Sequence, residues 1–127
     1  MKSEELTGKI IACAYRVHNV LGTGFLEKVY ENAMMIELRK EGLQVHQQHN
    51  IPVYYEGQLV GDYFADIVVE GEIIVELKAV EHLAKIHEVQ LVNYLKGINQ
   101  EIGLLINFGT SVEVKRKYKN PLNPNKR

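Results

Sequence analysis

Most features that argue against a compact soluble domain are missing from the sequence. It has a single cysteine, Cys13, so no internal disulfide can form. No apolar run approaches the roughly 18 to 20 residues that cross a membrane, and the first residues lack the pattern of a secretory signal peptide. The sequence contains no internal repeat, domain-length linker or low-complexity segment. We therefore expect a cytoplasmic protein with no membrane segment.

Net charge is also nearly absent. The formal charge is −1 at pH 7, whereas a domain that binds duplex nucleic acid is usually clearly basic. Nucleic-acid binding would therefore depend on local patches or on a partner. One basic cluster near the C-terminus is either a solvated tail or a phosphate-binding surface; it consists of Lys115, Arg116, Lys117, Lys119, Lys126 and Arg127.

Apolar residues are plentiful enough for a folded core. The chain has 127 residues, of which 46% are hydrophobic and 24% charged, which indicates one folded domain rather than disorder. We assign residues 1–119 to this domain and residues 120–127 to a flexible tail. Cys13 lies among apolar residues at helical spacing, which predicts a buried structural thiol.

The spacing of apolar residues predicts helices and strands in a definite order. Helices are expected at about 3–21, 25–40 and from 81 or 82 to 97, and strands at 51–55, 58–69, 73–79, 101–108 and 112–118. The first three strands form an antiparallel meander, and Pro52 indicates that its first strand is short or lies at an edge. The fourth strand follows a helix and is expected to run parallel to a neighbour. The pattern predicts an α/β fold with a mixed central sheet.

Two acids and a lysine stand out where strand residues are normally apolar. Glu76 and Lys78 share one face of their strand, because strand side chains alternate. A three-residue loop at 70–72 would place Asp66 opposite Glu76 on that face, whereas a two-residue turn at 70–71 would send Asp66 to the other face. Neighbouring carboxylates repel one another unless a proton or a cation neutralises them, and oxygen ligands suit Mg²⁺ or Mn²⁺. The alternative is that these are surface charges on an edge strand.

Four further polar residues are candidates because of their positions on helices. Glu27 lies at the edge of the apolar arc of the second helix, as an acid that either flanks the core or faces a site. Tyr30 follows it by one turn and belongs either to the core or to the surroundings of the site. Glu37 also falls within this arc, so angular position alone does not make an acid functional. Gln90 is expected in the middle of an apolar face of the third helix, with Tyr94 one turn later.

These residues carry a resemblance to a known family. Asp66, followed after nine residues by Glu76-Leu77-Lys78, resembles the signature of the PD-(D/E)XK nuclease superfamily, with Ala65 in place of its proline. Residues 24–30, Gly-Phe-Leu-Glu-Lys-Val-Tyr, are similar to the G-x-x-E-x-x-Y signature of a small family within that superfamily. Gln90 and Tyr94 resemble a Gln-x-x-x-Tyr motif of some exonuclease branches. The resemblance covers roughly residues 5–115.

The resemblance implies a fold. The superfamily shares a restriction-endonuclease-like core with α-β-β-β-α-β order, which is the order expected here once the first helix is set aside as an N-terminal addition.

The resemblance also implies a metal-dependent nuclease that cleaves DNA or, less readily, RNA. In such an enzyme Asp66, Glu76 and the Leu77 carbonyl would hold Mg²⁺ or Mn²⁺, and Glu27 would add a ligand or an outer anchor. Lys78 and Gln90 would orient the attacking water or a phosphate oxygen, and Tyr30 and Tyr94 would lie near the site or the substrate.

Two other functions remain open at this point. The chain is alternatively a nuclease-fold module that binds nucleic acid or a protein without cutting, or a plain interaction domain whose acids are surface charges. Its small size leaves no room for a separate recognition domain, so a homodimer or a larger complex is a further expectation.

Overall fold

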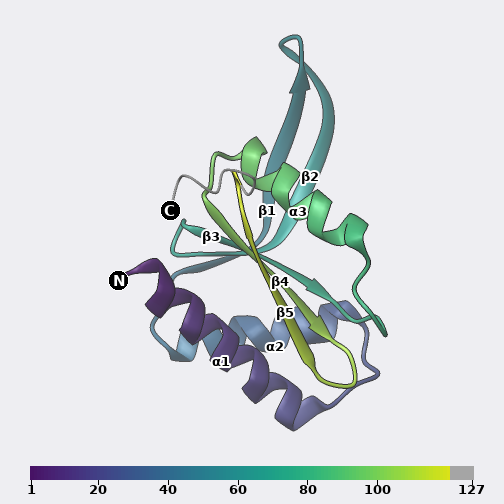
Figure 1. Cartoon of the computed structure of the whole chain (residues 1–127). Coiled ribbons are helices and arrows are strands. Elements are labelled where there is room, and N and C mark those ends of the chain that lie inside the picture. Colours follow the sequence, from purple (N-terminus) through teal and green to yellow (C-terminus); the bar gives the residue numbers. More distant parts are fainter. Residues whose placement is uncertain (121–127) are drawn as a thin grey trace.

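A five-stranded mixed sheet forms the centre of the fold. The computed structural model describes residues 1–120, and its strands lie in the order β1-β2-β3-β4-β5. Neighbouring strands are antiparallel except for β3 and β4, which are parallel. The elements are α1 (Ser3–Leu21), α2 (Glu27–Lys40), β1 (Val45–Tyr55), β2 (Gln58–Val69), β3 (Ile73–Lys78), α3 (Lys85–Gly97), β4 (Ile102–Phe108) and β5 (Val112–Tyr118), as shown in Figure 1. The predicted α/β class and element order are confirmed.

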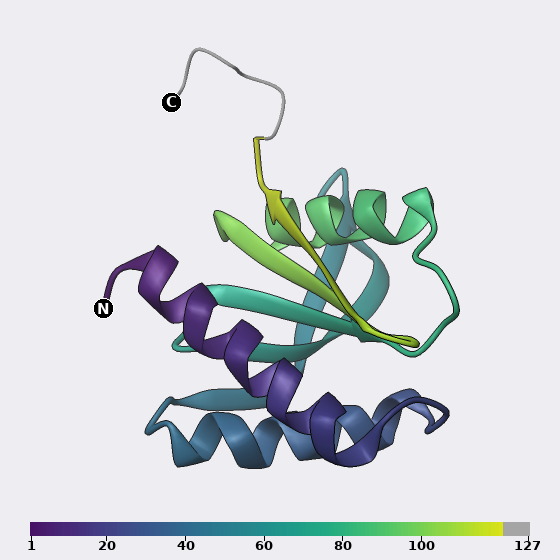
Figure 2. The same ribbon diagram turned by 60° about the horizontal axis from the view of Figure 1, so that its bottom comes forward.

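The helices lie in two layers on opposite faces of the sheet. Figure 2 shows α1 and α2 on one side and α3 on the other. The larger core cluster lies under α1 and α2 and includes Ile10, Tyr30 and Phe108, whereas the smaller one lies under α3 around Leu91 and Leu95. Strands β3 and β4 are buried on both faces, which explains why their sequences are nearly continuous apolar runs.

The sequence predicted that the fourth strand runs parallel to a neighbour, because a helix precedes it, and the structure shows that this neighbour is β3. That helix, α3, packs very closely on β4. A Cβ atom added at Gly103 would lie 2.8 Å from Cδ1 of Leu91, which has no exposed surface. Gly103 therefore allows the close approach of α3 to the sheet.

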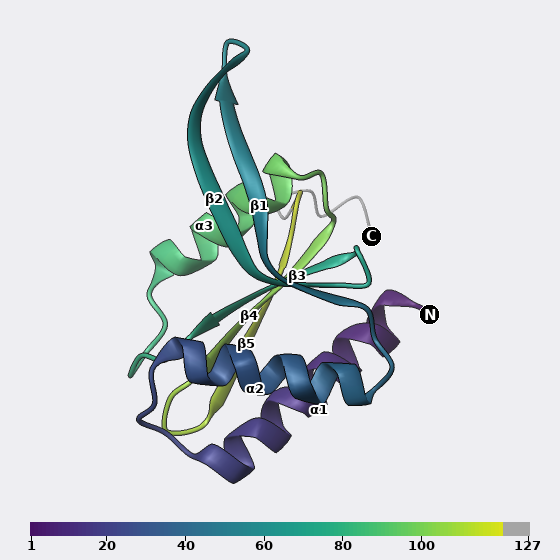
Figure 3. The same ribbon diagram turned by 180° about the vertical axis from the view of Figure 1, so that it is seen from behind.

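The hairpin of β1 and β2 is much longer than the rest of the sheet. Its outer half, residues 49–64, extends beyond the other strands, and we refer to it as the arm (Figures 1 and 3). The sequence predicted a strand only at 51–55, because residues 46–50 are polar and show no alternation of apolar side chains. The edge position that Pro52 indicated is confirmed, since β1 has β2 as its single neighbour.

Two predicted helix starts were too early. Helix α2 begins at Glu27 rather than near 25, because Leu26 is extended and 23–26 form the connection from α1. Helix α3 begins at Lys85 rather than at 81 or 82, because the chain first has to leave the end of β3.

The predicted burial of Cys13 is confirmed. Most of the predicted tail, residues 121–127, lies outside the described residues. No helix within residues 1–120 is long and apolar enough to span a membrane.

The close contact between α3 and β4 makes a testable prediction. Gly103→Ala should lower the free energy of unfolding by about 1–3 kcal/mol, because the new methyl group overpacks a buried leucine. Gly8→Ala is the matched control, since Gly8 lies within α1 with nothing near its added Cβ. That control should gain about 0.5–1 kcal/mol. Equal midpoints of urea unfolding for the two variants would contradict the prediction.

Candidate active site

The turn between β2 and β3 decides where Asp66 lies. Val69 pairs with Ile73 and Ile67 with Val75, so residues 70–72 form the three-residue loop. Glu70 and Gly71 both have positive φ, 55° and 64°, which produces the tight reversal. Continuing this register places Asp66 opposite Glu76, as the sequence predicted for this loop length.

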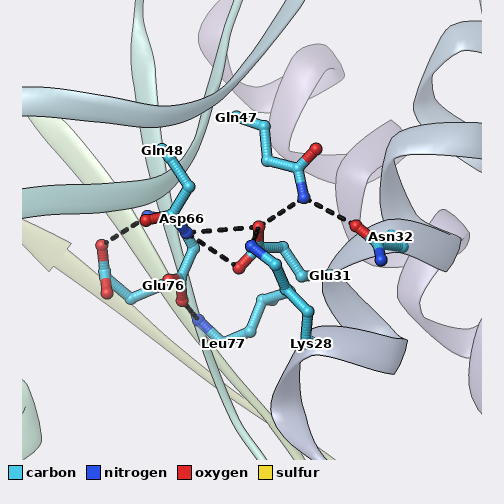
Figure 4. A network of polar contacts seen from close by, with 8 residues as sticks. All are labelled: Lys28, Glu31, Asn32, Gln47, Gln48, Asp66, Glu76 and Leu77. Atoms are coloured by element: carbon cyan, nitrogen blue, oxygen red, sulfur yellow. Dashed lines mark hydrogen bonds and ion pairs between the residues drawn. The ribbon is translucent and has the colours of Figure 1, made fainter.

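The two acids replace the backbone ladder at the point where β2 and β3 separate. Beyond the Ile67 and Val75 pair, the Leu77 N–H donates to Asp66 Oδ2 at 2.8 Å, and the Asp66 N–H donates to Glu76 Oε1 at 3.1 Å (Figure 4). Each carboxylate therefore uses one oxygen to join the strands. Its second oxygen takes no part in these two bonds.

Strand β1 is also irregular beside Asp66. The pairs Gln47 with Ile67 and His49 with Ala65 flank Gln48, which has φ of 56° and drops out of the ladder. A positive φ is uncommon for glutamine and is often found at functional sites. The alternation of faces changes here, because Ala65 packs under α3 whereas Ile67 packs under α1 and α2. Asp66 therefore lies at a kink where the arm leaves the sheet.

Burial makes the two acids hard to ionise. It raises the pKa of Glu76, which is only 7% exposed, to about 8, and the charge of Asp66 adds to this increase. Burial likewise raises the pKa of Asp66 to about 6, against the effect of the hydrogen bond from Leu77. The negative charges of Glu31 and Glu27 raise the pKa of Asp66 further.

Helix α2 contributes Glu31, which the sequence analysis missed. Its carboxylate is 4% exposed and accepts hydrogen bonds from Lys28 Nζ at 2.9 Å and Gln48 Nε2 at 3.1 Å, and another from Gln47 (Figure 4). Glu27 lies one turn earlier on the same face of α2 and is exposed. Among the described residues, no side-chain hydrogen bond to Glu27 is present.

Two other residues act on the acid pair. Lys78 is half-buried at the end of β3, and its positive charge lowers the pKa of both Asp66 and Glu76. Tyr63 hydrogen-bonds to Glu76, and burial followed by the Glu76 charge raises the pKa of the tyrosine hydroxyl. The ring of Tyr63 stacks on that of Tyr94 from α3, with centroids 3.4 Å apart.

The expected position of Gln90 was wrong. Gln90 is exposed, and the buried face of α3 is formed by Leu91 and Leu95 instead. Ile86, one of the apolar residues whose spacing suggested that face, is 54% exposed. The start of the helix and its rotation were misjudged together, because the apolar residues of this segment fit more than one arc.

Tyr30 lies in the core, one of the two positions that the sequence left open. Its hydroxyl donates to the Gly22 carbonyl at 2.7 Å, and its ring stacks on Phe108 with centroids 4.5 Å apart. Tyr30 therefore fastens the connection between α1 and α2 to the sheet.

The expected basic cluster is divided between the two faces of β5. Arg116 donates to Thr7 of α1 at 3.0 Å, whereas Lys117 pairs with Glu88 of α3 at 3.0 Å. Alternation along the strand separates their side chains, so residues 115–119 do not form one continuous patch. Lys126 and Arg127 lie outside the described residues.

Comparison with known proteins identifies the family. Residues 4–119 match the family described as the PD-(D/E)XK nuclease superfamily. The chain belongs to the PD-(D/E)XK nuclease superfamily. Its structure is similar to the crystal structure of SSO0001, with a TM-score of 0.58 and 18% sequence identity. The likeness covers 94% of this chain but 61% of that one, and at this identity it shows the fold alone. No curated protein matches the sequence.

Nucleases of the PD-(D/E)XK superfamily generally use divalent metals, and the acid pair fits such an ion. Asp66 and Glu76 offer hard oxygen donors, and their raised pKa values mean that a cation would relieve both burial and repulsion. Within residues 1–120 no group of three or more His, Cys, Asp or Glu side chains is arranged to hold a metal ion. The fit therefore rests on the two acids, with backbone oxygen, water or substrate completing the coordination.

Of the site residues that the sequence did not predict, some could have been found from their spacing and others could not. Glu31 lies four residues after Glu27, so the two share a helix face, and this spacing was available. The positive φ of Gln48 could not be predicted, because a glutamine in the sequence gives no indication of this backbone conformation. The contact of Tyr63 with Glu76 depends on the kink at Asp66, which alternation along the strand does not predict.

The raised pKa values predict how stability depends on pH. In the unfolded chain both acids titrate near pH 4, so between about pH 4 and 8 the folded protein binds more protons than the unfolded one. With divalent cations chelated, the free energy of unfolding should therefore fall as the pH rises through this range.

Isosteric variants separate the contribution of Glu76 from that of other acids. Glu76→Gln should make the free energy of unfolding less dependent on pH between about pH 6 and 8, where Glu76 is expected to titrate. Glu72→Gln, in the exposed loop, should leave it unchanged. Urea unfolding at a series of pH values measures both, and a slope that survives Glu76→Gln would contradict the assignment.

Proposed function

We propose that this protein is a divalent-metal-dependent nuclease of the G-x-x-E-x-x-Y family within the superfamily. The observation that carries the proposal is the buried pair of Asp66 and Glu76 beside Lys78, at the point where β2 and β3 separate. Two acids that repel one another in a low-dielectric site are costly unless they bind something. Mg²⁺ or Mn²⁺ is the ion that suits them, and DNA is the favoured substrate, with RNA second.

Asp66 and Glu76 hold the ion in this proposal, with the Leu77 carbonyl as a third oxygen. A bound divalent ion would supply positive charge to the scissile phosphate and to the attacking water. The acids keep their shared position because each is hydrogen-bonded to a backbone N–H of the opposite strand. They must lose their protons before they can bind a cation, so metal affinity rises with pH.

Lys78 lies beside the acids and is the cation that the chain itself provides. It orients the attacking water and offsets negative charge that develops on the phosphate. Its position at the last residue of β3 fixes it relative to Glu76, two residues earlier on the same face.

Glu27 and Glu31, both on α2, have different roles in this proposal. Glu31 is already engaged by Lys28, Gln47 and Gln48, so it anchors the kinked segment of β1 beside Asp66. Glu27 is exposed, and its carboxylate remains available to an incoming ion or water. Tyr63 positions Glu76 through its hydroxyl, and Gln90, exposed on α3, is an outer contact for a phosphate oxygen.

Metal binding is the first test. Calorimetric titration of Mn²⁺ and Mg²⁺ should show a site that Asp66→Asn and Glu76→Gln each remove. These amide variants keep an oxygen for the backbone N–H groups that the acids accept from, whereas alanine would leave them unpaired. Asp62→Asn is the matched control on the same strand, exposed and remote from the pair, and should bind as the wild type does.

Cleavage is tested on single-stranded and duplex DNA with the same variants. Asp66→Asn and Glu76→Gln should lower the rate by about a hundredfold or more, and Asp62→Asn should not. Wild-type protein that binds DNA and metal but never cleaves would replace this proposal with that of a non-catalytic binding module.

Lys78 provides a separate test of the chemistry. Lys78→Met should keep the metal affinity of the site, yet lower kcat by about a hundredfold or more, because the group that orients water and offsets charge is missing. Lys85→Met, at the exposed start of α3, is the control. If kcat were unchanged in Lys78→Met, the proposed role of this lysine would be wrong.

A further inference from the structure

A cleft at the carboxyl ends of β3 and β4 has no role in the proposed nuclease chemistry. Its volume is about 380 Å³, and its walls are residues 23–26, 79–81 and 108–110. These are the connection from α1 to α2, the segment that leaves β3 and the turn between β4 and β5. Two of the walls meet at the carboxyl end of the parallel pair of strands, where α/β folds generally bind ligands.

Two walls of the cleft are joined through the chain to residues of the proposed site. Leu26, in one wall, is followed by Glu27, and Ala79, in another wall, follows Lys78. Consecutive Cα atoms are about 3.8 Å apart. Glu27 and Lys78, which the proposed function places at the site, are therefore each one residue away from a wall of the cleft.

The lining of the cleft is unsuited to a phosphate. Among the residues of the lining that the structure describes there is no lysine, arginine or histidine, and the one charged side chain is the acid Glu81. The remaining lining combines apolar side chains with the hydroxyls of Thr23 and Thr110. A volume within the range of about 300–1,000 Å³ for small-molecule sites, with a mixed apolar and polar lining, suits a neutral flat group.

Phe25 gives the cleft an aromatic surface that is held in place. Its ring is 45% exposed and packs edge-on against Tyr30, with centroids 6.1 Å apart and an interplanar angle of 79°. Tyr30 is itself fixed by its stack on Phe108 and its hydrogen bond to Gly22. A base that stacks on Phe25 would meet a surface whose orientation is set before binding.

We propose that this cleft binds an unpaired nucleobase of the substrate strand, stacked on Phe25, next to the phosphate at the acid pair. The proposal rests on the proposed nuclease function and names its substrate as a single strand or an unpaired end. Glu81 accepts a hydrogen bond from an exocyclic amino group, so cytosine, adenine and guanine fit better than thymine.

Binding to single-stranded DNA tests the stacking surface. The probe is a fluorescent oligonucleotide of about 12 nucleotides of mixed sequence, measured by anisotropy in Ca²⁺. Phe25→Ala should raise the dissociation constant by about tenfold, since stacking on an aromatic side chain is worth about 1–3 kcal/mol per base. Tyr15→Ala is the control, because Tyr15 on α1 is 49% exposed and lies outside the cleft. Binding to a blunt duplex should be equal in both variants.

A second readout places the base at the cleft itself. The chain contains no tryptophan, so Phe25→Trp introduces a single fluorescent indole. Single-stranded DNA should quench it, whereas the indole of Tyr15→Trp should be unaffected. This variant keeps a large aromatic ring at position 25, so it also tests whether the result with Phe25→Ala is due to lost folding.

The outcomes separate the two proposals. If the wild type cleaves DNA but Phe25→Ala binds single strands as tightly as Tyr15→Ala does, the cleft proposal is overturned and the nuclease proposal stands. If the wild type neither binds nor cleaves any strand with Mg²⁺ or Mn²⁺, the nuclease proposal is overturned and the cleft proposal with it.

Discussion

The contact between Asp66 and Glu76 is the constraint on which the rest of the structure depends. Two strands that have paired through their backbones separate at this point, and the acids continue the connection by accepting the N–H groups of Leu77 and Asp66. Because burial and mutual repulsion raise both pKa values, the junction has opposite requirements for folding and for ion binding. The protein is most stable when the acids are protonated, whereas the proposed cation would bind best when they are not. Functional sites often contain groups with shifted pKa values that destabilise the fold locally but are needed for the chemistry.

The surrounding architecture holds that junction from three directions. Helix α2 lies under it with Glu31, whose bonds to Gln47 and Gln48 fix the irregular segment of β1. Strand β3, buried on both faces, fixes Glu76 and Lys78 from the other side. From above, the stacked rings of Tyr63 and Tyr94 tie the arm to α3. The fold thus places side chains from two helices and from three strands around one pair of acids.

Much of this arrangement followed from the sequence, where one physical rule decided the outcome. The number of residues in the loop after Val69 sets the strand register, so it also sets which face Asp66 shares with Glu76. The parallel pairing of β4 followed in the same way from the helix that precedes it. The rotation of α3 did not, because its apolar residues fit several arcs and Gln90 proved to be exposed. Nor did the position of Gln48, since its backbone conformation is imposed by the neighbouring strand and by Glu31 rather than by its own side chain.

The composition of the long hairpin determines the direction from which a polyanion can approach. Strands β1 and β2 and the turn between them contain no lysine or arginine, while Glu56, Asp62 and Asp66 add negative charge. This hairpin therefore attracts no phosphate backbone and instead forms an electrostatic barrier along one border of the site. Positive charge comes instead from Lys78, at the end of β3, and from Lys28, on the first turn of α2, which pairs with Glu31. A nucleic acid that approached the acids would meet negative charge on the side of the hairpin and positive charge on the side of α2. It would therefore be directed toward α2.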